Sequence, residues 1–138
     1  MKDVIARSFV IIMVIIAITA LFSRIAIERI IKINITQDES NAELTLKSIA
    51  TAIENYARDH LGVFPTSLSV LTQNQPSYLD KSYITQTCLK GYNYSCPRLE
   101  SSGYSCAAVP LKCKLTGKKI YTITTGGLLV SEECSGNE

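Results

Sequence analysis

The chain has 138 residues, and its 14 Lys and Arg against 12 Asp and Glu give a net charge of +2. This size fits one small domain and argues against a two-domain enzyme. The near balance of charge argues against the basic surface that is typical of nucleic-acid binding. All 7 Gly, 4 Pro and 5 Cys follow Leu61. Residues 1–61 therefore contain no strong helix breaker, whereas residues 62–138 carry every Gly, every Pro and every thiol.

The N-terminal region is strongly apolar, and 16 residues without a charged side chain separate Arg7 from Arg24. This run is slightly shorter than the about 20 apolar residues of a full membrane span, but isoleucines extend it to Ile33. We expect residues 9–33 to form a transmembrane helix. A secretory signal peptide is disfavoured because Ile18-Thr19-Ala20 is a poor cleavage site. A buried soluble helix is disfavoured because the run is apolar on every side.

A second helical pattern, over residues 34–61, follows the apolar run. Its apolar residues recur at steps of four and three, which places them on one stripe of a helix. The stripe consists of Ala42, Leu46, Ile49, Ile53 and Tyr56. Facing away from it are Glu43, Lys47, Thr51, Glu54 and Arg58. Because an uncovered apolar stripe is rarely stable, we expect the C-terminal part of the same chain to pack on it.

This second helix has a predicted end and a predicted weak point. Gly62 suits the left-handed residue that follows a helix, and Pro65 prevents the helix from resuming. The weak point is residues 34–40, a polar stretch of poor helix formers. We expect any break or local melting of the helix in this stretch.

The remaining residues carry the signals of an antiparallel sheet. Residues 91–96 and 103–110 alternate like strands, and a loop containing Pro97 is expected between them. Residues 118–132 read as strand, Gly126-Gly127 turn and strand, which is a strong hairpin signal. The predicted fold is α+β: a long N-terminal helix, membrane-embedded in its first half, packed on a small antiparallel sheet of three to four strands.

The five cysteines favour disulfide bonds over a zinc site. They are Cys88, Cys96, Cys106, Cys113 and Cys134. Their spacing contains no C-x-x-C pair and the single histidine is remote, whereas zinc sites favour paired ligands. Disulfides require an oxidising compartment, so the C-terminal part is expected on that side of the membrane. The odd count leaves one thiol over, and the possible pairings remain open.

No catalytic constellation is predicted. His60, the only histidine, lies beside Asp59 at the expected end of a helix. The favoured interpretation is a helix-end residue whose charged ring interacts favourably with the helix dipole, rather than a catalytic residue. Glu132, Glu133 and Asn137 are weak candidates for calcium ligands. A solvated acidic tail is favoured for them because the ligand spacing of a calcium loop is missing. We expect neither an enzymatic activity nor a cofactor.

The combination of features resembles the type IV pilin superfamily, and more narrowly the major pseudopilins of type II secretion systems and related pilin-like proteins. The resemblance covers nearly the whole chain. Its more specific segments are residues 42–71, AELTLKSIATAIENYARDHLGVFPTSLSVL, and residues 104–129, YSCAAVPLKCKLTGKKIYTITTGGLL. The first resembles the family's helix end with Gly62 and Pro65, and the second resembles its final strands.

The resemblance implies a filament subunit that a prepilin peptidase trims and that is then N-methylated. Residues 1–8 correspond to the leader, with the cut after Ser8 and Phe9 as the methylated N-terminus. Residues 9–33 correspond to the membrane and filament-core helix, residues 34–61 to its exposed amphipathic part, and residues 62–138 to the globular domain. The helix residues implied in assembly are Phe9, Ile12, Met13, Ile16 and Phe22.

The resemblance also implies a location and partners. The chain would cross the inner membrane once, with its C-terminal domain in the periplasm or on an extracellular filament of a type IV pilus or a type II secretion system that serves protein transport. Its partners would be other copies or related pilin-like subunits, an inner-membrane assembly platform and the prepilin peptidase. The sequence does not choose between a secretion, an adhesive and a DNA-uptake filament.

Two positions depart from the family pattern. The family usually has Gly before the cut and Glu at the fifth mature position, where this chain has Ser8 and Met13. A carboxylate in the bilayer is costly unless it is paired, so the family's Glu acts as an assembly device, which Met13 cannot reproduce. A minor, initiating or tip subunit would tolerate this loss best. The alternative is a single-pass anchored periplasmic binding or structural domain that does not polymerise.

Overall fold

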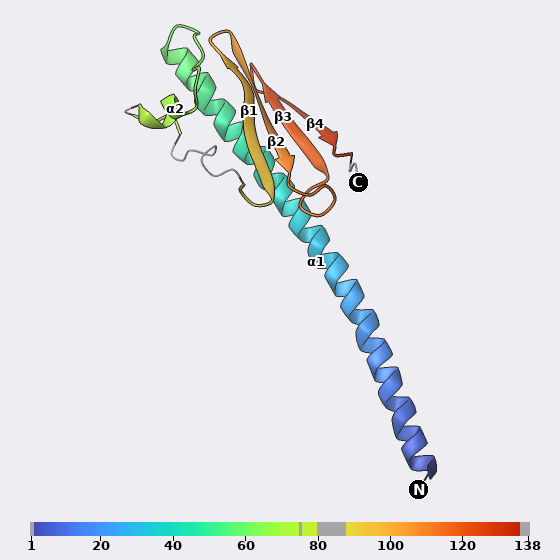
Figure 1. Ribbon diagram of the computed structural model, residues 1–138. Coiled ribbons are helices and arrows are strands. Elements are labelled where there is room, and N and C mark those ends of the chain that lie inside the picture. Colours follow the sequence, from blue (N-terminus) through green and yellow to red (C-terminus); the bar gives the residue numbers. More distant parts are fainter. Residues whose placement is uncertain (1, 75, 80–87, 136–138) are drawn as a thin grey trace. The chain divides into compact units, whose positions relative to one another are not determined.

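The computed structural model describes residues 2–74, 76–79 and 88–135 (Figure 1). Their elements are α1 (Lys2–Asp59), α2 (Ser69–Gln73), β1 (Tyr92–Glu100), β2 (Gly103–Pro110), β3 (Lys119–Thr124) and β4 (Leu128–Glu133). The chain divides into two compact units, Met1–Asn34 and Ile35–Glu138, and the boundary falls within α1. The predicted α+β class is confirmed.

The four strands form one antiparallel sheet in the order β1-β2-β3-β4, so each strand pairs with its neighbour in the chain. The predicted hairpin between β3 and β4 is confirmed. Its turn contains Gly126 at φ 84° and Gly127 at φ 73°, left-handed values that glycine adopts at little cost. Consecutive hairpins of this kind need only short connections, which suits the small size of the domain.

Strand β1 is longer than the sequence predicts. It continues through Pro97 to Glu100, where a loop is expected, and turns back into β2 after two residues. The pairing register shifts between Ser95 and Arg98, which marks a bulge around Pro97. Because β1 is an edge strand, the missing N–H of proline leaves no inner ladder partner unsatisfied. The prediction of a loop was therefore wrong.

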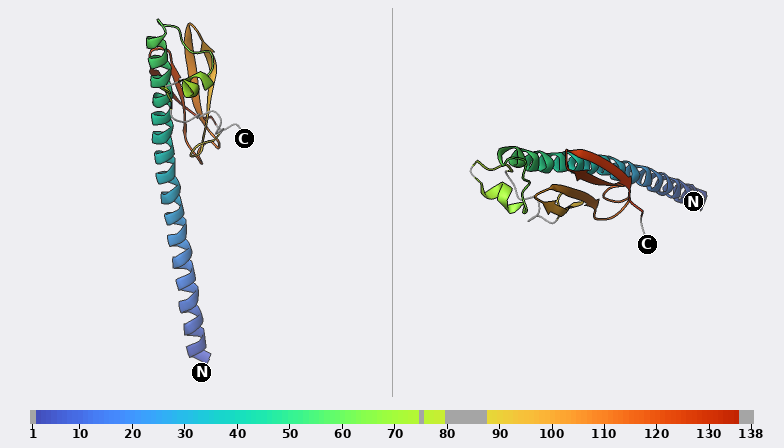
Figure 2. Two further views of the ribbon diagram at one scale, coloured as in Figure 1. Left: turned by 90° about the vertical axis from the view of Figure 1, so that its left-hand side faces the viewer. Right: turned by 90° about the horizontal axis from the view of Figure 1, so that it is seen from above.

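The core lies between the sheet and the C-terminal part of α1, as the stripe predicts. Figures 1 and 2 show the sheet alongside the blue-green to green part of this helix. Four stripe residues are almost completely buried: Ala42, Leu46, Ile49 and Ile53. Their main partners from the sheet are Tyr92, Tyr94, Tyr104, Cys106, Tyr121 and Ile123. Tyr56, the last stripe residue, is half-buried against this cluster.

Truncation of a core residue is expected to destabilise the domain strongly. Ile53 has no exposed surface, so Ile53→Ala leaves a cavity and should lower the free energy of unfolding by about 2–5 kcal/mol. Leu44→Ala on the same helix is the matched control, because Leu44 is 62% exposed. Urea unfolding in detergent micelles, followed by near-ultraviolet circular dichroism, measures both. Equal losses for the two variants would contradict the packing described here.

The predicted break at residues 34–40 is wrong, because α1 is helical throughout this stretch. Contacts with the rest of the domain stabilise the helical conformation that the low helix propensity of these residues disfavours. Ile35 is 5% exposed, and the Glu39 carboxylate accepts a hydrogen bond of 2.7 Å from the backbone N–H of Lys118. Propensity differences of a few tenths of a kcal/mol per residue are smaller than the gain from such contacts.

The end of α1 is close to its predicted place. The helix ends at Asp59, and the N–H of Gly62 donates to the carbonyl of Ala57 at 2.7 Å. Gly62 adopts φ 85°, as predicted for a residue after a helix. Leu61 also has a positive φ, 56°, which the sequence does not predict. The left-handed turn thus begins one residue before the glycine.

Candidate functional site

The main candidate site is the apolar segment, residues 9–33 of α1. Within the part of the chain that the structure describes, α1 is the helix that is long and apolar enough to cross a membrane, with a mean hydropathy of 2.7 in its most apolar window. Its large apolar side chains from Phe9 to Ile33 are exposed on all sides of the helix. Such a surface is stable only against lipid or other apolar helices.

The structure brings four of the five expected assembly residues together on one helix face. Phe9, Ile12, Met13 and Ile16 recur at spacings of three and four, so their side chains lie along one side of α1. Phe22 is not at such a spacing from any of them and lies on another side. All five are 53–66% exposed. The segment therefore offers apolar contacts in more than one direction. Ser8, the other residue expected at the processing site, also lies in the helix and is exposed.

The two hydroxyl groups within the apolar segment bond to its own backbone. The Thr19 hydroxyl donates to the carbonyl of Ile16 at 2.9 Å. The Ser23 hydroxyl donates to the carbonyl of Thr19 at 2.6 Å. An unsatisfied polar group in hydrocarbon costs several kcal/mol, so these bonds make the segment compatible with a bilayer.

Charge returns on one side of the helix toward the end of the segment. Arg24, Glu28 and Lys32 follow one another at intervals of four residues and therefore share a face. Arg29 lies on the adjoining side of the helix, and the isoleucines from Ile25 to Ile33 keep the opposite side apolar. This arrangement fits a helix that leaves the bilayer gradually rather than at one residue.

Two disulfides stabilise the sheet. Cys96 of β1 bonds to Cys106 of β2, and Cys113 of the β2–β3 connection bonds to Cys134 just after β4. Cys88 is the remaining thiol and is exposed. The structure thus chooses one pairing among those that the sequence leaves open. Bonds of this kind indicate an oxidising compartment.

The weak calcium candidates are not brought together. Glu132 and Glu133 are successive residues of β4, so their side chains point to opposite faces of the strand. Asn137 lies outside the described residues. Among the residues that the structure describes, no group of three or more His, Cys, Asp or Glu side chains is arranged to hold a metal ion.

His60 is placed as a helix-end residue. Its ring stacks on that of Tyr56 with 3.8 Å between ring centroids. Its Nδ1 lies 2.8 Å from the carbonyl oxygen of Tyr56 and bonds to it in the tautomer that carries a proton there. This carbonyl also accepts the backbone N–H of His60 at 3.0 Å, so the imidazole adds a second bond to it at the end of the helix.

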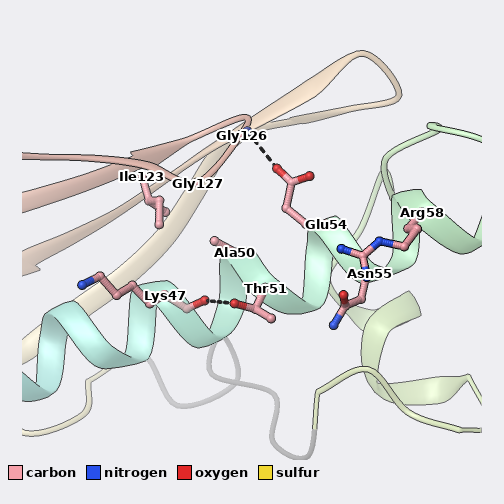
Figure 3. A pocket seen from close by; sticks show the side chains of 9 residues that line it. All are labelled: Lys47, Ala50, Thr51, Glu54, Asn55, Arg58, Ile123, Gly126 and Gly127. Carbon is pink, nitrogen blue, oxygen red and sulfur yellow. Dashed lines mark hydrogen bonds between the residues drawn. The ribbon is translucent and has the colours of Figure 1, made fainter.

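A surface groove of about 530 Å³ lies between α1 and the β3–β4 turn (Figure 3). Its charged residues are Lys47, Glu54 and Arg58. Glu54 was expected to face away from the sheet, but its Oε1 accepts hydrogen bonds from the backbone N–H of Gly126 at 2.8 Å and from the Tyr104 hydroxyl at 3.1 Å. The carboxylate therefore joins the helix to two parts of the sheet. The sequence pattern missed this role because periodicity predicts only the side of a helix, not the partner that reaches it.

Removal of the Glu54 carboxylate should destabilise the domain moderately. Glu54→Ala leaves the N–H of Gly126 and the hydroxyl of Tyr104 without their acceptor, for an expected loss of about 1–3 kcal/mol. Glu54→Gln retains an acceptor oxygen and should lose clearly less. Chemical unfolding of both variants in micelles provides the comparison. A glutamine variant as unstable as the alanine variant would show that the two bonds do not matter.

Tyrosine burial gives the domain a dependence on alkaline pH. Burial, together with the hydrogen bond and charge of Glu54, raises the pKa of Tyr104 above its ordinary value of about 10. Burial and the nearby Glu39 raise the pKa of Tyr92 in the same direction. The unfolded chain loses these protons near pH 10 while the folded chain keeps them, so stability is full below pH 10 and falls as the pH rises further.

The variant Tyr104→Phe tests this dependence. It removes one phenol that must stay protonated in the fold, so its unfolding free energy should fall less steeply above pH 10 than that of the natural chain. The limiting difference is about 1.4 kcal/mol per pH unit. Unfolding measured in parallel at neutral and alkaline pH gives the two slopes. Identical slopes would contradict a role for Tyr104 in the alkaline transition.

The chain was compared with family models, with curated proteins and with solved structures, and none of them matches it.

Proposed function

We propose that the protein is a pilin-like or pseudopilin subunit of a type IV pilus or type II secretion filament. Residues 9–33 anchor it in the inner membrane and then pack against the same segment of neighbouring subunits. The domain formed by Ile35–Glu138 stands on the oxidising side and forms the surface of the filament. The protein acts by assembly and has no catalytic role.

One observation carries this proposal. The first part of α1 is an apolar segment that is exposed on all sides. The same helix then carries an apolar stripe that is covered by a disulfide-bonded antiparallel sheet. A membrane anchor alone needs about 20 apolar residues. Here the helical pattern continues without interruption into the core of the domain, as far as Asp59. This continuity is what the resemblance to the pilin superfamily implies for a subunit whose helix forms the filament core.

Packing supplies the mechanism of assembly. Lipid chains are as apolar as the side chains of the segment, so helices associate in a bilayer through close van der Waals contact rather than through a hydrophobic driving force. Phe9, Ile12, Met13 and Ile16 offer one contact face and Phe22 offers another. Two faces let each helix contact more than one neighbour, which a filament requires.

The mass of the protein isolated from membranes tests this proposal. A processed pilin begins at Phe9 and carries one N-terminal methyl group. The proposal predicts the loss of residues 1–8 and this added methyl group. An intact chain that begins at Met1 without a methyl group would contradict processing as a pilin.

A specific observation favours a second candidate function. Met13 stands where the family's assembly carboxylate is usual, and Ser8 stands where glycine usually precedes the cut. Both departures favour an anchored periplasmic domain that binds a partner and does not polymerise. Self-association through residues 9–33 separates the two functions, because only a filament subunit requires it.

A further inference from the structure

We propose that a basic patch on the sheet domain binds the anionic phospholipid headgroups of the membrane in which residues 9–33 are anchored. This inference rests on the proposed membrane anchoring. The patch is formed by the connection between β2 and β3, the first residue of β3 and one neighbouring residue before β1. Its members are Lys90, Lys112, Lys114, Lys118 and Lys119. Lys90 lies beside the connection because the N–H of Leu111 donates to the carbonyl of the next residue, Gly91, at 2.9 Å.

The five ammonium groups of the basic patch are available to an external anion. All five lysines are exposed. None of them forms an ion pair with a carboxylate among the residues that the structure describes. Among the described residues, the carboxylates close to these lysines are Asp38 and Glu39 of α1 and Glu132 and Glu133 of β4, and Glu133 pairs in register with Lys119. The five lysines outnumber these four carboxylates, so the charge of the described groups is positive here.

Two exposed leucines give the same connection an apolar component. Leu111 is 53% exposed and Leu115 is 54% exposed, and each is adjacent in sequence to a lysine of the patch. Lysines with apolar neighbours suit the boundary between headgroups and hydrocarbon, where the charge meets phosphate and the apolar side chain enters the acyl region. A surface that bound only soluble anions would gain nothing from the leucines.

The connection is held in a defined conformation. The N–H of Lys114 donates to the carbonyl of Gly117 at 2.7 Å. The N–H of Thr116 donates to the carbonyl of Lys112 at 2.9 Å. The Cys113–Cys134 disulfide fixes it to the end of β4. Little conformational entropy is therefore lost when the patch meets a flat surface.

The patch lies at the end of the domain that is close in the chain to residues 9–33. The backbone N–H of Lys118 donates to the carboxylate of Glu39 at 2.7 Å, and the connection runs beside α1 in Figure 1. Glu39 is six residues after Ile33, so even a fully extended chain separates them by at most about 20 Å. The opposite end of the sheet is fixed near Glu54 and Phe64 instead. The tether thus holds this end of the domain near the headgroups.

Each lysine at an anionic surface contributes about a fivefold increase in affinity for it. Because residues 9–33 already retain the chain, the patch would act on the position of the domain rather than on membrane binding itself. It would hold the domain against the lipid before assembly, and extraction of a subunit into a filament would break these contacts.

Tryptophan depth measurements on the full-length chain test this inference. The chain has no Trp, so Leu115→Trp supplies a single reporter, with Leu111→Trp as a second. Each protein is reconstituted into neutral phosphatidylcholine vesicles and into vesicles with about a third phosphatidylglycerol, both containing brominated lipids that quench near the headgroups. Quenching is expected to be about twofold greater or more in the anionic vesicles.

Two further variants control the measurement. Replacement of Lys112, Lys114, Lys118 and Lys119 by Gln in the Leu115→Trp background should lower the quenching in anionic vesicles to the neutral level. Val63→Trp reports from the other end of the domain, where Val63 is half-exposed, and should show little quenching in either vesicle. Quenching of the Val63→Trp reporter equal to that of the loop reporters would overturn the inference, since it would show that the whole domain lies on the lipid.

Flotation of the same vesicles separates this inference from the proposed function. If the chain floats with the vesicles but the loop reporters are quenched equally in neutral and anionic lipid, or in neither, the basic patch does not bind headgroups and the anchoring stands. If the chain does not float, the anchoring fails and the inference fails with it.

Discussion

Substitution of Ile12 and Ile16 by lysine is expected to release the chain from membranes. The two side chains lie one turn apart in the apolar segment and are 53% and 58% exposed on the helix surface. A lysine at the centre of a spanning helix costs about 2.5–3.5 kcal/mol and one nearer its end costs less, so the pair costs at most about 5–7 kcal/mol. The remaining apolar side chains contribute a few tenths of a kcal/mol each, so insertion becomes unfavourable or marginal.

The matched control for this substitution is Leu44→Lys. Leu44 is an apolar residue of the same helix and is 62% exposed, but it lies beyond the apolar segment. Membrane association is measured by alkaline carbonate extraction and by flotation. The control should stay in the membrane fraction, whereas the double variant should appear in the soluble fraction or be degraded. A double variant that remains embedded would contradict the assignment of residues 9–33 as the span.

Removal of both disulfides should have the second large effect, a loss of about 6 kcal/mol in the free energy of unfolding. Cys96–Cys106 joins residues 10 apart and Cys113–Cys134 joins residues 21 apart. The loss of loop-closure entropy in the unfolded chain accounts for about 3 kcal/mol of stability for each bond. The bond that closes the longer loop, Cys113–Cys134, contributes slightly more. A small domain has a total stability of only about 5–15 kcal/mol, so the doubly reduced domain should be largely or partly unfolded at growth temperature.

The variants Cys96→Ser with Cys106→Ser, and Cys113→Ser with Cys134→Ser, test the two bonds one at a time. Cys88→Ser is the matched control because Cys88 is exposed and has no disulfide partner. Thermal unfolding in micelles, with and without reductant, should separate the paired variants from the control. An unchanged melting temperature on reduction would contradict the disulfide assignment and favour a zinc site as the role of the cysteines.

Much of the fold was predictable because the sequence carries strong local signals. The stripe through Leu46 and Ile53 predicted the buried face of α1, and Gly126-Gly127 predicted the β3–β4 hairpin. The alternation in residues 91–96 predicted a strand, and Tyr92 and Tyr94 lie on the buried face of β1. Each of these signals is a period or a turn that the backbone must satisfy whatever the rest of the chain does.

What the sequence did not predict depends on contacts between distant residues. Residues 34–40 stay helical because Glu39 meets the backbone of Lys118, and Pro97 is accepted in β1 because its strand is at the edge of the sheet. Glu54 was assigned to the solvent side because no local pattern indicates that Tyr104 reaches it. The disulfide pairing and the clustering of Lys90 with the lysines of the β2–β3 connection likewise required the fold.

Cross-linking within the apolar segment tests the central claim most directly. A photo-reactive amino acid is introduced at Ile16 in the full-length protein, and cells under conditions that assemble filaments are irradiated. If residues 9–33 form the filament core, the helix faces of neighbouring subunits are in contact and irradiation yields covalent dimers and higher multimers. A membrane-anchored protein that yields only monomer would contradict assembly through this segment and establish the anchored, non-polymerising domain instead.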